Sequence, residues 1–364
     1  MNDTKDILEG TFSYLDKENM IKDLEGISQH IEKALKLGEM YSNSIFADNE
    51  NVILYKNVKN ITFLGMGGSA IGGNLMTGYL ADEINVPINV IRGYDIPKYI
   101  DKDSMVFAIS YSGNTEETFS TLKQSHEKGA KIIILSSGGH FEVFTKQKNI
   151  PFIALPSGIQ PRVALPFLFF PVLKVLEKIR LIEKRDVEIF EMLQILNKIS
   201  GEYGFKSEVK SNLAKKIALS LFRHLPLVYG SEGILSAVAM RWKTQINENS
   251  KWPSFWNTFA ELDHNEIVGY EIENEVNKLV KIVYLEDRNG LLRIKQRASI
   301  TKNIIRNKVR EFITCTSIGE NKLSRMFSLI YLGDMVSYYL AILNGINPSP
   351  VDCIENLKKE LKSN

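Results

Sequence analysis

Three hydroxyl side chains, Ser110, Ser112 and Thr115, lie within six residues of one another. Each could donate a hydrogen bond, and Gly113 between them would let the backbone approach a ligand closely. The segment follows an apolar run and precedes a helical pattern, and a helix start offers unpaired N–H groups and a partial positive charge. The pattern therefore favours a phosphate-binding loop. An ordinary helix cap formed by Asn114 or Thr115 is the alternative.

A second segment, Gly-Met-Gly-Gly-Ser at 65–69, also follows an apolar run. Gly65, Gly67 and Ala70 match a loose dinucleotide-binding fingerprint, which alone is a weak indication. The acidic residue expected about twenty positions later would be Glu83, before the next predicted strand rather than at its end. We therefore expect these glycines to let backbone amides approach a small oxyanion, rather than to bind a nicotinamide cofactor.

Three further residues could act on a bound substrate. Arg162 ends a turn that contains Pro and Gly, where a cation could neutralise a phosphate or a developing oxyanion. Glu248 lies where a long helical pattern ends. The negative end of a helix dipole tends to raise the pKa of a nearby carboxyl, and a raised pKa suits a general base. His264 lies in a polar turn and has no second histidine at metal-ligand spacing. Each could equally be a solvated surface side chain.

Short apolar runs alternate with helical patterns in the first half of the chain after residue 51. This alternation predicts a parallel sheet covered by helices on both faces. Ligands bind such sheets beyond the carboxyl ends of the strands, where both segments described above fall. The predicted strands are 61–64, 88–91, 105–109, 132–135 and 152–155, and the predicted helices are 74–81, 116–128, 141–148 and 163–179.

The second half resembles a diverged copy of the first in its pattern of strands and helices. Residues 230–233 take the place of the glycine segment, and residues 316–320 that of the hydroxyl segment. This copy lacks the Ser-x-Ser-x-x-Thr pattern, so we expect one phosphate site per chain. The predicted strands are 225–229, 279–285 and 312–315, and the predicted helices are 234–246, 291–306, 323–343 and 354–361.

Composition excludes several classes of protein. A formal net charge of +2, with no long run of like charges, gives no indication of nucleic acid or an anionic membrane as partner. Cys315 and Cys353 are too few for a disulfide framework and lack metal-ligand spacing. The first residues lack the profile of a signal peptide, and the most apolar segment, 163–176, is short for a membrane span and contains Pro166 and Pro171. We expect a cytoplasmic protein.

The 364 residues are enough for two domains with separate cores. The predicted division is a helical arm, a first domain with the phosphate loop, a charged helical connection, a second domain and a tail helix: 1–45, 46–180, 181–212, 213–346 and 347–364.

The candidate residues belong to six motifs that occur in order along the chain: Gly-Met-Gly-Gly-Ser (65–69), Ser-Tyr-Ser-Gly-Asn-Thr-Glu-Glu-Thr (110–118), Pro-Ser-Gly with Pro-Arg (156–162), Asn-Glu-Asn-Ser-Lys (247–251), Glu-Leu-Asp-His-Asn-Glu (261–266) and Leu-Gly-Asp-Met-Val-Ser-Tyr-Tyr-Leu-Ala (332–341). Together they make the chain resemble the bifunctional phosphoglucose/phosphomannose isomerases, a branch of the phosphoglucose isomerase superfamily with two sugar-isomerase (SIS) domains. The resemblance runs from about residue 45 to the end. The chain departs from it at Ala70, where Gly is common, and at Ala260, where Pro often occurs.

The resemblance implies an α/β fold with two SIS domains, each a parallel β-sheet flanked by helices in a flavodoxin-like three-layer sandwich. It implies an aldose–ketose isomerase that interconverts glucose 6-phosphate, and also mannose 6-phosphate, with fructose 6-phosphate. No metal or organic cofactor is implied. The implied assembly is a homodimer.

The resemblance also implies a role for each candidate residue in binding. Gly68 and Arg162 would face the reacting carbons. The sugar phosphate would be bound by hydroxyl groups of two segments: Ser69, Ser110, Ser112 and Thr115.

In the same way, Glu248 matches the base that moves a proton between C2 and C1 through a cis-enediol. His264 matches the histidine that opens the sugar ring, which in this family reaches the site from the neighbouring subunit. Lys358 matches a C-terminal lysine that assists ring opening, although Lys359 is adjacent and could be the active lysine.

Two other functions use the same domain. A non-catalytic SIS sugar-phosphate sensor could keep the phosphate loop but would not need Glu248, His264 and Lys358 together. The isomerase half of a glucosamine-phosphate synthase would need an N-terminal cysteine for its glutaminase, and this chain has no cysteine before residue 315.

Overall fold

The computed structural model describes residues 7–10, 12 and 14–363, and its internal contacts divide the chain into two compact units. The N-terminal unit comprises residues 26–190. The C-terminal unit comprises the described residues up to 25 together with those from 191 onward. The described part of the predicted arm, 1–45, is thus divided between the two units; residues 1–6, 11 and 13 of the arm lie outside the described residues.

The N-terminal unit is built on a five-stranded parallel sheet with the strand order β2-β1-β3-β4-β5. All five predicted strands are confirmed. The central strands β1 and β3 are buried at every position, as expected for apolar runs in a sheet covered on both faces. The strands are β1 (Asn60–Leu64), β2 (Ile88–Ile91), β3 (Ser104–Ser110), β4 (Lys131–Ser136) and β5 (Phe152–Ala154).

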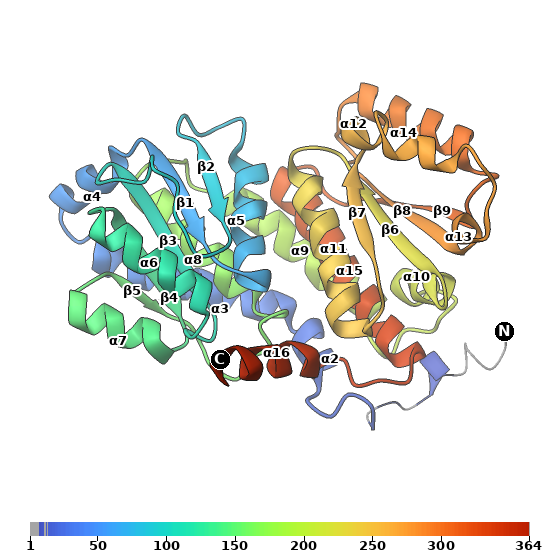
Figure 1. Ribbon diagram of the computed structural model, residues 1–364, viewed down its shortest axis with the longest axis horizontal. Helices are drawn as coiled ribbons and strands as arrows, with labels where there is room; N and C mark the ends of the chain where they lie inside the picture. The colour runs from blue at the N-terminus through green and yellow to red at the C-terminus, as the bar shows by residue number, and fades with distance from the viewer. Residues whose placement is uncertain (1–6, 11, 13, 364) are drawn as a thin grey trace. The chain divides into compact units, whose positions relative to one another are not determined.

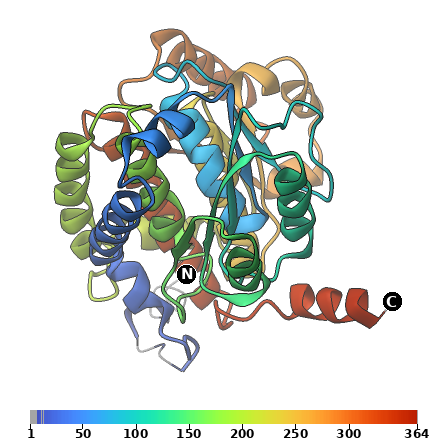
Figure 2. The same cartoon turned by 90° about the vertical axis from the view of Figure 1, so that its left-hand side faces the viewer.

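Helices cover both faces of this sheet (Figures 1 and 2). Helices α6 and α7 lie on one face, and α5 and α8 lie on the other, where α3 packs along α8. The helices are α3 (Ile27–Ile45), α4 (Asn49–Lys56), α5 (Gly67–Leu80), α6 (Glu116–Glu127), α7 (Gly139–Lys148) and α8 (Leu165–Lys178), and α9 (Asp186–Tyr203) begins in this unit.

Helix α5 begins seven residues before the predicted helix at 74–81, inside the glycine segment. Glycine has low helix propensity, so its presence argued against a helix there. Packing decides the outcome. A Cβ on Gly73 would lie 2.7 Å from the Phe63 ring, and one on Gly72 would lie 3.2 Å from the Leu168 carbonyl oxygen. These glycines let α5 approach β1 and α8 closely.

The C-terminal unit contains a four-stranded parallel sheet with the order β7-β6-β8-β9. Three of its strands were predicted. The fourth, β7, was missed because it is a short edge strand whose residues are exposed or half-buried, so it has no apolar run. The strands are β6 (Leu225–Gly230), β7 (Phe255–Thr258), β8 (Val280–Glu286) and β9 (Glu311–Thr316).

The missed strand changes how the two halves correspond. With β7 in place, β8 is the counterpart of β3, and residues 287–290 follow it where the hydroxyl segment follows β3. The prediction that 316–320 takes that place was wrong, because this segment follows β9, the counterpart of β4. The expected loss of the Ser-x-Ser-x-x-Thr pattern still holds, since 287–290 reads Asp-Arg-Asn-Gly.

Helices also cover both faces of the second sheet. Helices α10, α11 and α15 pack on one face, and α12, η1 and α14 lie over the other. The elements are α2 (Met20–Glu25), α10 (Leu213–Leu221), α11 (Ile234–Ser250), α12 (Phe259–Leu262), η1 (Glu266–Tyr270), α13 (Glu275–Leu279), α14 (Leu292–Ile305), α15 (Lys322–Leu343) and α16 (Asp352–Ser363).

Helix α15 is the central helix of the C-terminal unit. It is long and apolar enough to cross a membrane by length and composition, but it is buried within the protein along the window that meets this test. It packs along α11, and the Arg241 guanidinium lies 2.7 Å from the Asp334 carboxylate between them. Gln245 donates to the same carboxylate at 2.8 Å. A buried ion pair with a third partner fixes the register of the two helices.

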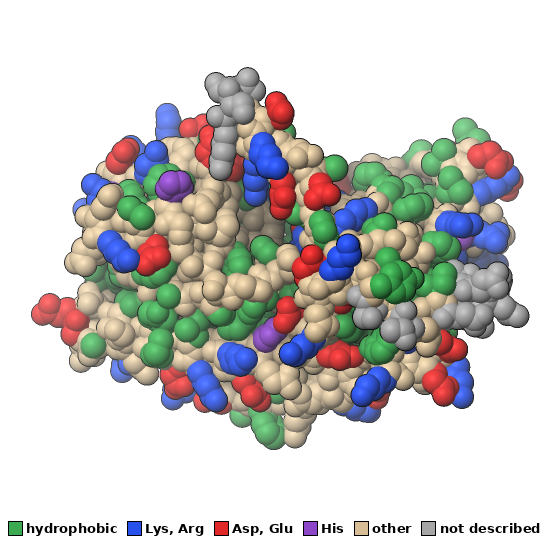
Figure 3. All heavy atoms as spheres, turned by 90° about the horizontal axis from the view of Figure 1, so that it is seen from below, with side chains coloured by type: hydrophobic (Ala, Val, Ile, Leu, Met, Phe, Trp, Pro, Cys, Tyr) green, Lys and Arg blue, Asp and Glu red, His purple; other side chains and the backbone are tan. Residues whose placement is uncertain are grey.

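Charged side chains of both signs are interspersed on the face seen in Figure 3. This agrees with the nearly balanced composition of the chain.

We predict that Gly333→Ala lowers the free energy of unfolding of the C-terminal unit by about 1–3 kcal/mol. The added Cβ would lie 2.3 Å from Nε1 of Trp242, which donates to the Leu329 carbonyl. Urea unfolding followed by tryptophan fluorescence measures this, because Trp242, Trp252 and Trp256, the three tryptophans of the chain, all belong to this unit.

The matched control is Gly201→Ala in α9, where an added Cβ meets nothing within 4 Å. This variant should gain about 0.5–1 kcal/mol from helix propensity. Equal effects of the two alanines would contradict the proposed packing of Gly333.

Candidate active site

The hydroxyl segment leaves β3 at Ser110 and ends at the start of α6. Thr115 occupies the N-cap position, but it makes no capping hydrogen bond, and its Oγ1 lies 2.9 Å from Ser110 Oγ. Asn114 does not cap α6 either, because its side chain donates to the Ser112 carbonyl and accepts from the His140 N–H, both at 3.1 Å. The ordinary helix cap is therefore contradicted, and the first N–H groups of α6 are not capped by any described side chain.

The loop after β4 holds the hydroxyl segment in shape. Gly113 has φ +68°, and a Cβ there would lie 1.7 Å from the Gly138 carbonyl oxygen. The Ser137 hydroxyl donates to the Tyr111 carbonyl at 2.6 Å, and the Phe141 N–H donates to the Gly113 carbonyl at 3.2 Å. Gly113 is thus required for its backbone conformation and for the close approach of two loops.

Tyr111 connects three segments of the N-terminal unit. Its backbone N–H donates to the Ser69 hydroxyl at 3.3 Å, which joins the end of β3 to the first turn of α5. Its hydroxyl donates to the Pro156 carbonyl at 2.7 Å and accepts from the Ile159 N–H at 3.1 Å. The turn after β5 is therefore held beside the hydroxyl segment.

The first turn of α5 contains Gly67, Gly68 and Ser69, and its N-cap residue makes no side-chain hydrogen bond. A Cβ on Gly68 would lie 3.3 Å from the Pro161 carbonyl oxygen, so Gly68 packs against the turn that leads into Arg162. Arg162 itself is buried, with 4% of its surface exposed.

The predicted binding residues therefore meet at one edge of the first sheet. β1 and β3 are adjacent, but β1 is followed by β2 on one side while β3 is followed by β4 on the other. Their carboxyl ends form the switch point in strand order where open α/β sheets bind ligands. Two uncapped helix N-termini and several hydroxyl groups there suit an anion such as phosphate. The residues gathered at this edge are Gly68, Ser69, Ser110, Ser112, Thr115 and Arg162.

Glu248 lies in the last turn of α11 and is half-buried. Its flanks are anchored to α15, because Asn249 donates to the Ser337 hydroxyl at 2.9 Å and Ser250 donates to the Ser337 carbonyl at 2.7 Å. Lys251 ends the helix in a left-handed conformation, and its ammonium donates to the Glu248 carbonyl at 2.9 Å. A cation therefore lies at the helix end where the sequence predicted an unopposed negative dipole.

His264 lies between α12 and η1 and is exposed. Its backbone N–H donates to the Glu261 carbonyl at 3.0 Å, which makes this segment a tight turn. Lys358 lies in α16, whose residues 352–361 are all exposed.

The elements that carry Glu248 and His264 lie at opposite ends of the C-terminal unit. Helix α12, which comes just before His264, lies at one end, and the last turn of α11, which carries Glu248, lies toward the other (Figure 1). The turn that begins α11 contacts α12, because the Glu232 carboxylate accepts from the Ala260 N–H at 3.1 Å. Glu248 lies near the far end of α11, on the order of 20 Å from this turn at a rise of 1.5 Å per residue.

Comparison with known proteins identifies the family. The chain is 41% identical over 342 residues to a bifunctional phosphoglucose/phosphomannose isomerase of Caldicellulosiruptor bescii, across 94% of this chain and 98% of that one. The chain belongs to the bifunctional phosphoglucose/phosphomannose isomerase family. The family protein of Aquifex aeolicus is 35% identical over 311 residues, across 84% of this chain and 91% of that one.

Domain comparisons agree with this family. Residues 54–147 match the SIS domain, and residues 210–361 match the bacterial phospho-glucose isomerase C-terminal SIS domain. The crystal structure of a hypothetical protein from Thermus thermophilus has the same fold, with a TM-score of 0.74 over 95% of this chain and 90% of that one, at 14% identity. The predicted α/β fold with two SIS domains is confirmed.

Sequence reasoning missed several residues that shape the candidate site of this phosphoglucose/phosphomannose isomerase family member. Tyr111 lies between two predicted binding residues, but the sequence gives no sign that its hydroxyl bonds to the turn after β5. Ser137 and Gly138 belong to a segment with no motif of its own. Only the adjacency of β3 and β4 reveals their role. The Gly-Gly pair at 138–139 was the one available signal.

No group of three or more His, Cys, Asp or Glu residues that could hold a metal ion occurs in the part of the chain that the structure describes.

We predict that Gly113→Ala abolishes phosphate binding by this family member. The methyl group would collide with the Gly138 carbonyl and displace the hydroxyl segment. Binding of inorganic phosphate, measured by isothermal titration calorimetry, tests this.

The control is Gly129→Ala, which has a similar positive φ of +73° but only Lys102 Cβ at 3.8 Å. A left-handed alanine destabilises both variants by about 1–2 kcal/mol. Only Gly113→Ala should lose its affinity for phosphate. Retained phosphate affinity in Gly113→Ala would contradict the site.

Proposed function

We propose that this chain interconverts glucose 6-phosphate and mannose 6-phosphate with fructose 6-phosphate. The observation that carries the proposal is the 41% identity, over nearly the whole of both chains, to a relative named for both isomerase activities. The phosphate-binding geometry at the switch point of the first sheet agrees with a sugar phosphate as substrate.

The phosphate end of the sugar binds to Ser69, Ser110, Ser112 and Thr115 and to the N-termini of α5 and α6. This group does not react, so its binding energy serves to hold the sugar in position for the reaction at the other end. Fixed N–H and hydroxyl donors do this without reorganising when the substrate arrives, because hydrogen bonds to neighbouring loops already hold them.

The chemistry at C1 and C2 needs one base. The carboxylate of Glu248 takes the proton from C2 of the aldose, giving a cis-enediol, and returns it to C1 to give the ketose. The same carboxylate reverses the reaction by the opposite transfers, so no second base is needed. The Arg162 guanidinium stabilises negative charge on the enediolate oxygens. His264 and Lys358 open the pyranose ring before this step, as acid and base.

The active species is a homodimer in which His264 comes from a second copy. Glu248 and the element before His264 lie at opposite ends of the C-terminal unit, on the order of 20 Å apart along α11. One sugar cannot touch both groups of the same unit across this distance. A second copy can supply its His264 to the site of the first. In a closed two-fold dimer each chain supplies this histidine to the other, so both sites are complete.

A non-catalytic sensor has no support among the named relatives. A coupled assay that supplies glucose 6-phosphate and mannose 6-phosphate in parallel measures both activities directly. Turnover of neither sugar, with tight binding of fructose 6-phosphate, would overturn the proposal in favour of the sensor.

We predict that Glu248→Gln lowers kcat by about 10²–10⁴-fold, because the amide cannot accept the C2 proton. Affinity for a sugar phosphate should stay within a factor of about three, since the side chain keeps its shape. Steady-state kinetics and calorimetry measure the two effects. Glu202→Gln on the exposed side of α9 is the control and should have wild-type activity. Full activity of Glu248→Gln would overturn the mechanism.

We predict that two inactive variants restore activity when they are unfolded and refolded together. A dimer of one Glu248→Gln chain and one His264→Ala chain contains one site with both wild-type groups and one with neither. Random pairing therefore restores about a quarter of wild-type activity. Refolding each variant alone is the control. No recovery in a mixture that forms mixed dimers would show that His264 acts within its own chain.

A further inference from the structure

The turn that carries His264 is fixed from both sides by carboxylates that point into the C-terminal unit. Asp263 precedes the histidine, and Glu266 follows it two residues later. Both carboxylates are hydrogen-bonded to side chains from other elements, while His264 itself is exposed. A turn that only connected two helices could satisfy its polar groups with water and would not need buried partners.

Asp263 is held by α14. Its Oδ1 accepts a hydrogen bond from the Thr301 hydroxyl at 2.7 Å, and its Oδ2 lies 3.1 Å from a guanidinium nitrogen of Arg297. The Asp263 side chain is 11% exposed, and Thr301 is 2% exposed. These two contacts attach the residue before His264 to the side of α14 that packs against the unit, where Thr301 is buried.

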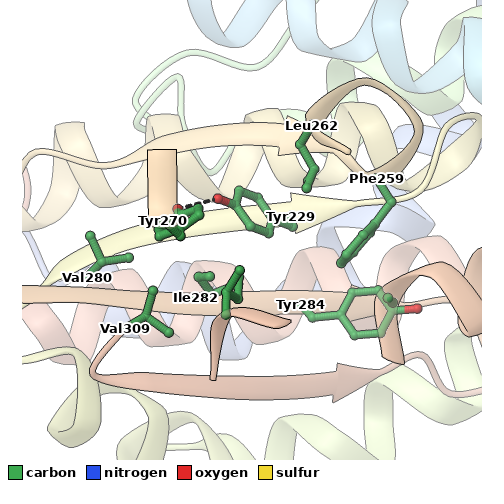
Figure 4. Close-up of a cluster of buried hydrophobic side chains, with 10 residues drawn as sticks. Tyr229, Phe259, Leu262, Tyr270, Val280, Ile282, Tyr284 and Val309 are labelled. Atoms are coloured by element: carbon green, nitrogen blue, oxygen red, sulfur yellow. Dashed lines mark hydrogen bonds between the residues drawn. The ribbon is translucent and has the colours of Figure 1, made fainter. Parts of the chain in front are cut away.

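Glu266 is held by β6 and β7. One carboxylate oxygen accepts from the Tyr229 hydroxyl, and the other accepts from the Asn257 amide at 2.6 Å. Tyr229 accepts in turn from the Tyr270 hydroxyl, at 2.7 Å. Figure 4 shows this pair of tyrosines joined at their hydroxyl groups within the hydrophobic core of the unit.

The tyrosine hydroxyls stay protonated and can act as donors. Burial raises the pKa of Tyr270 to about 12. Burial, together with the neighbouring Tyr270 and Glu266, raises the pKa of Tyr229 further. A chain of donors therefore runs from Tyr270 through Tyr229 to the Glu266 carboxylate at neutral pH.

We propose that Thr301 with Asp263, and Tyr229 with Glu266, are positioning residues that hold the His264 imidazole for opening the sugar ring. The inference rests on the ring-opening role of His264 given above. None of these four residues touches the sugar. They act by fixing both ends of a short turn, so that the imidazole keeps its place relative to a site on another chain. A shift of about 1 Å in such a group can lower a rate by a factor of a hundred.

The test separates ring opening from proton transfer in the full-length protein. Anomerisation of glucose 6-phosphate, followed by NMR exchange between its α and β forms, requires ring opening but no base at C2. Tyr229→Phe and Thr301→Val each remove one hydroxyl with little change of shape. We expect both variants to lose anomerisation and kcat together, roughly ten- to a hundredfold, with KM and phosphate affinity unchanged.

Three variants serve as controls. Tyr284→Phe removes a hydroxyl from the same core cluster, but that hydroxyl lies apart from the Tyr229–Tyr270 pair in Figure 4, and this variant should keep both rates. Thr301→Ser keeps the hydroxyl that donates to Asp263 and should restore most of the anomerisation lost in Thr301→Val. Tyr270→Phe leaves the bond from Tyr229 to Glu266 in place, so its loss should be smaller than that of Tyr229→Phe.

The outcomes are distinguishable. If Tyr229→Phe and Thr301→Val lower only the melting temperature, with anomerisation per folded molecule unchanged, the inference is overturned. It is also overturned if Thr301→Ser fails to rescue while folding normally. Glu248→Gln provides the separate test of the proposed proton transfer, because it should lose isomerisation while keeping anomerisation. Retained isomerisation in that variant would overturn the role of Glu248 and not the positioning of His264. A wild-type protein that turns over neither sugar would overturn the proposed function itself.

Discussion

The structure of the N-terminal unit depends on the point where the strand order of its sheet reverses. Strands β1 and β3 lie side by side, but their connections lead to opposite sides of the sheet, so α5 and α6 cover opposite faces. The two helices therefore begin next to each other at the same edge without blocking it. The geometry of the candidate phosphate site follows from this arrangement. The hydroxyl segment, the glycine turn and the turn before Arg162 meet there because each follows a strand of the same parallel sheet.

Backbone geometry at this edge depends on close contacts at two glycines. Gly113 has no room for a side chain against the loop after β4, and Gly68 packs closely against the turn after β5. Tyr111 joins the hydroxyl segment to the first turn of α5 through its N–H, and to the turn after β5 through its hydroxyl. Donors held in this way are preorganised and need not rearrange to receive an anion.

The C-terminal unit repeats the strand order of the N-terminal unit, but its candidate residues lie away from the corresponding loop. Its sheet has lost the hydroxyl pattern at the corresponding position, and its functional candidates lie elsewhere on α11, beyond α12 and on α16. The buried Arg241–Asp334 pair and the Ser337 contacts fix α11 against α15, and thereby fix Glu248. On the opposite edge, two carboxylates anchor the His264 turn to β6, β7 and α14. One scaffold thus supports two candidate groups at opposite ends of the unit.

The sequence by itself determined the class of fold and the five strands of the first sheet, and it singled out the hydroxyl segment as the candidate phosphate site. Buried parallel strands are continuous apolar runs, and glycine and hydroxyl residues at a strand end are unusual enough to be seen without a structure. Only the tertiary structure decided where α5 begins, because its glycines have poor helix propensity and are justified only by packing on Phe63 and Leu168. It also revealed β7, since an edge strand with no apolar run has no signal in the sequence, and its discovery changed which loops of the two halves correspond. The partners of Asp263 and Glu266 lie as far as 38 residues away in the chain, and contacts of this kind depend on which elements pack together instead of on any local pattern.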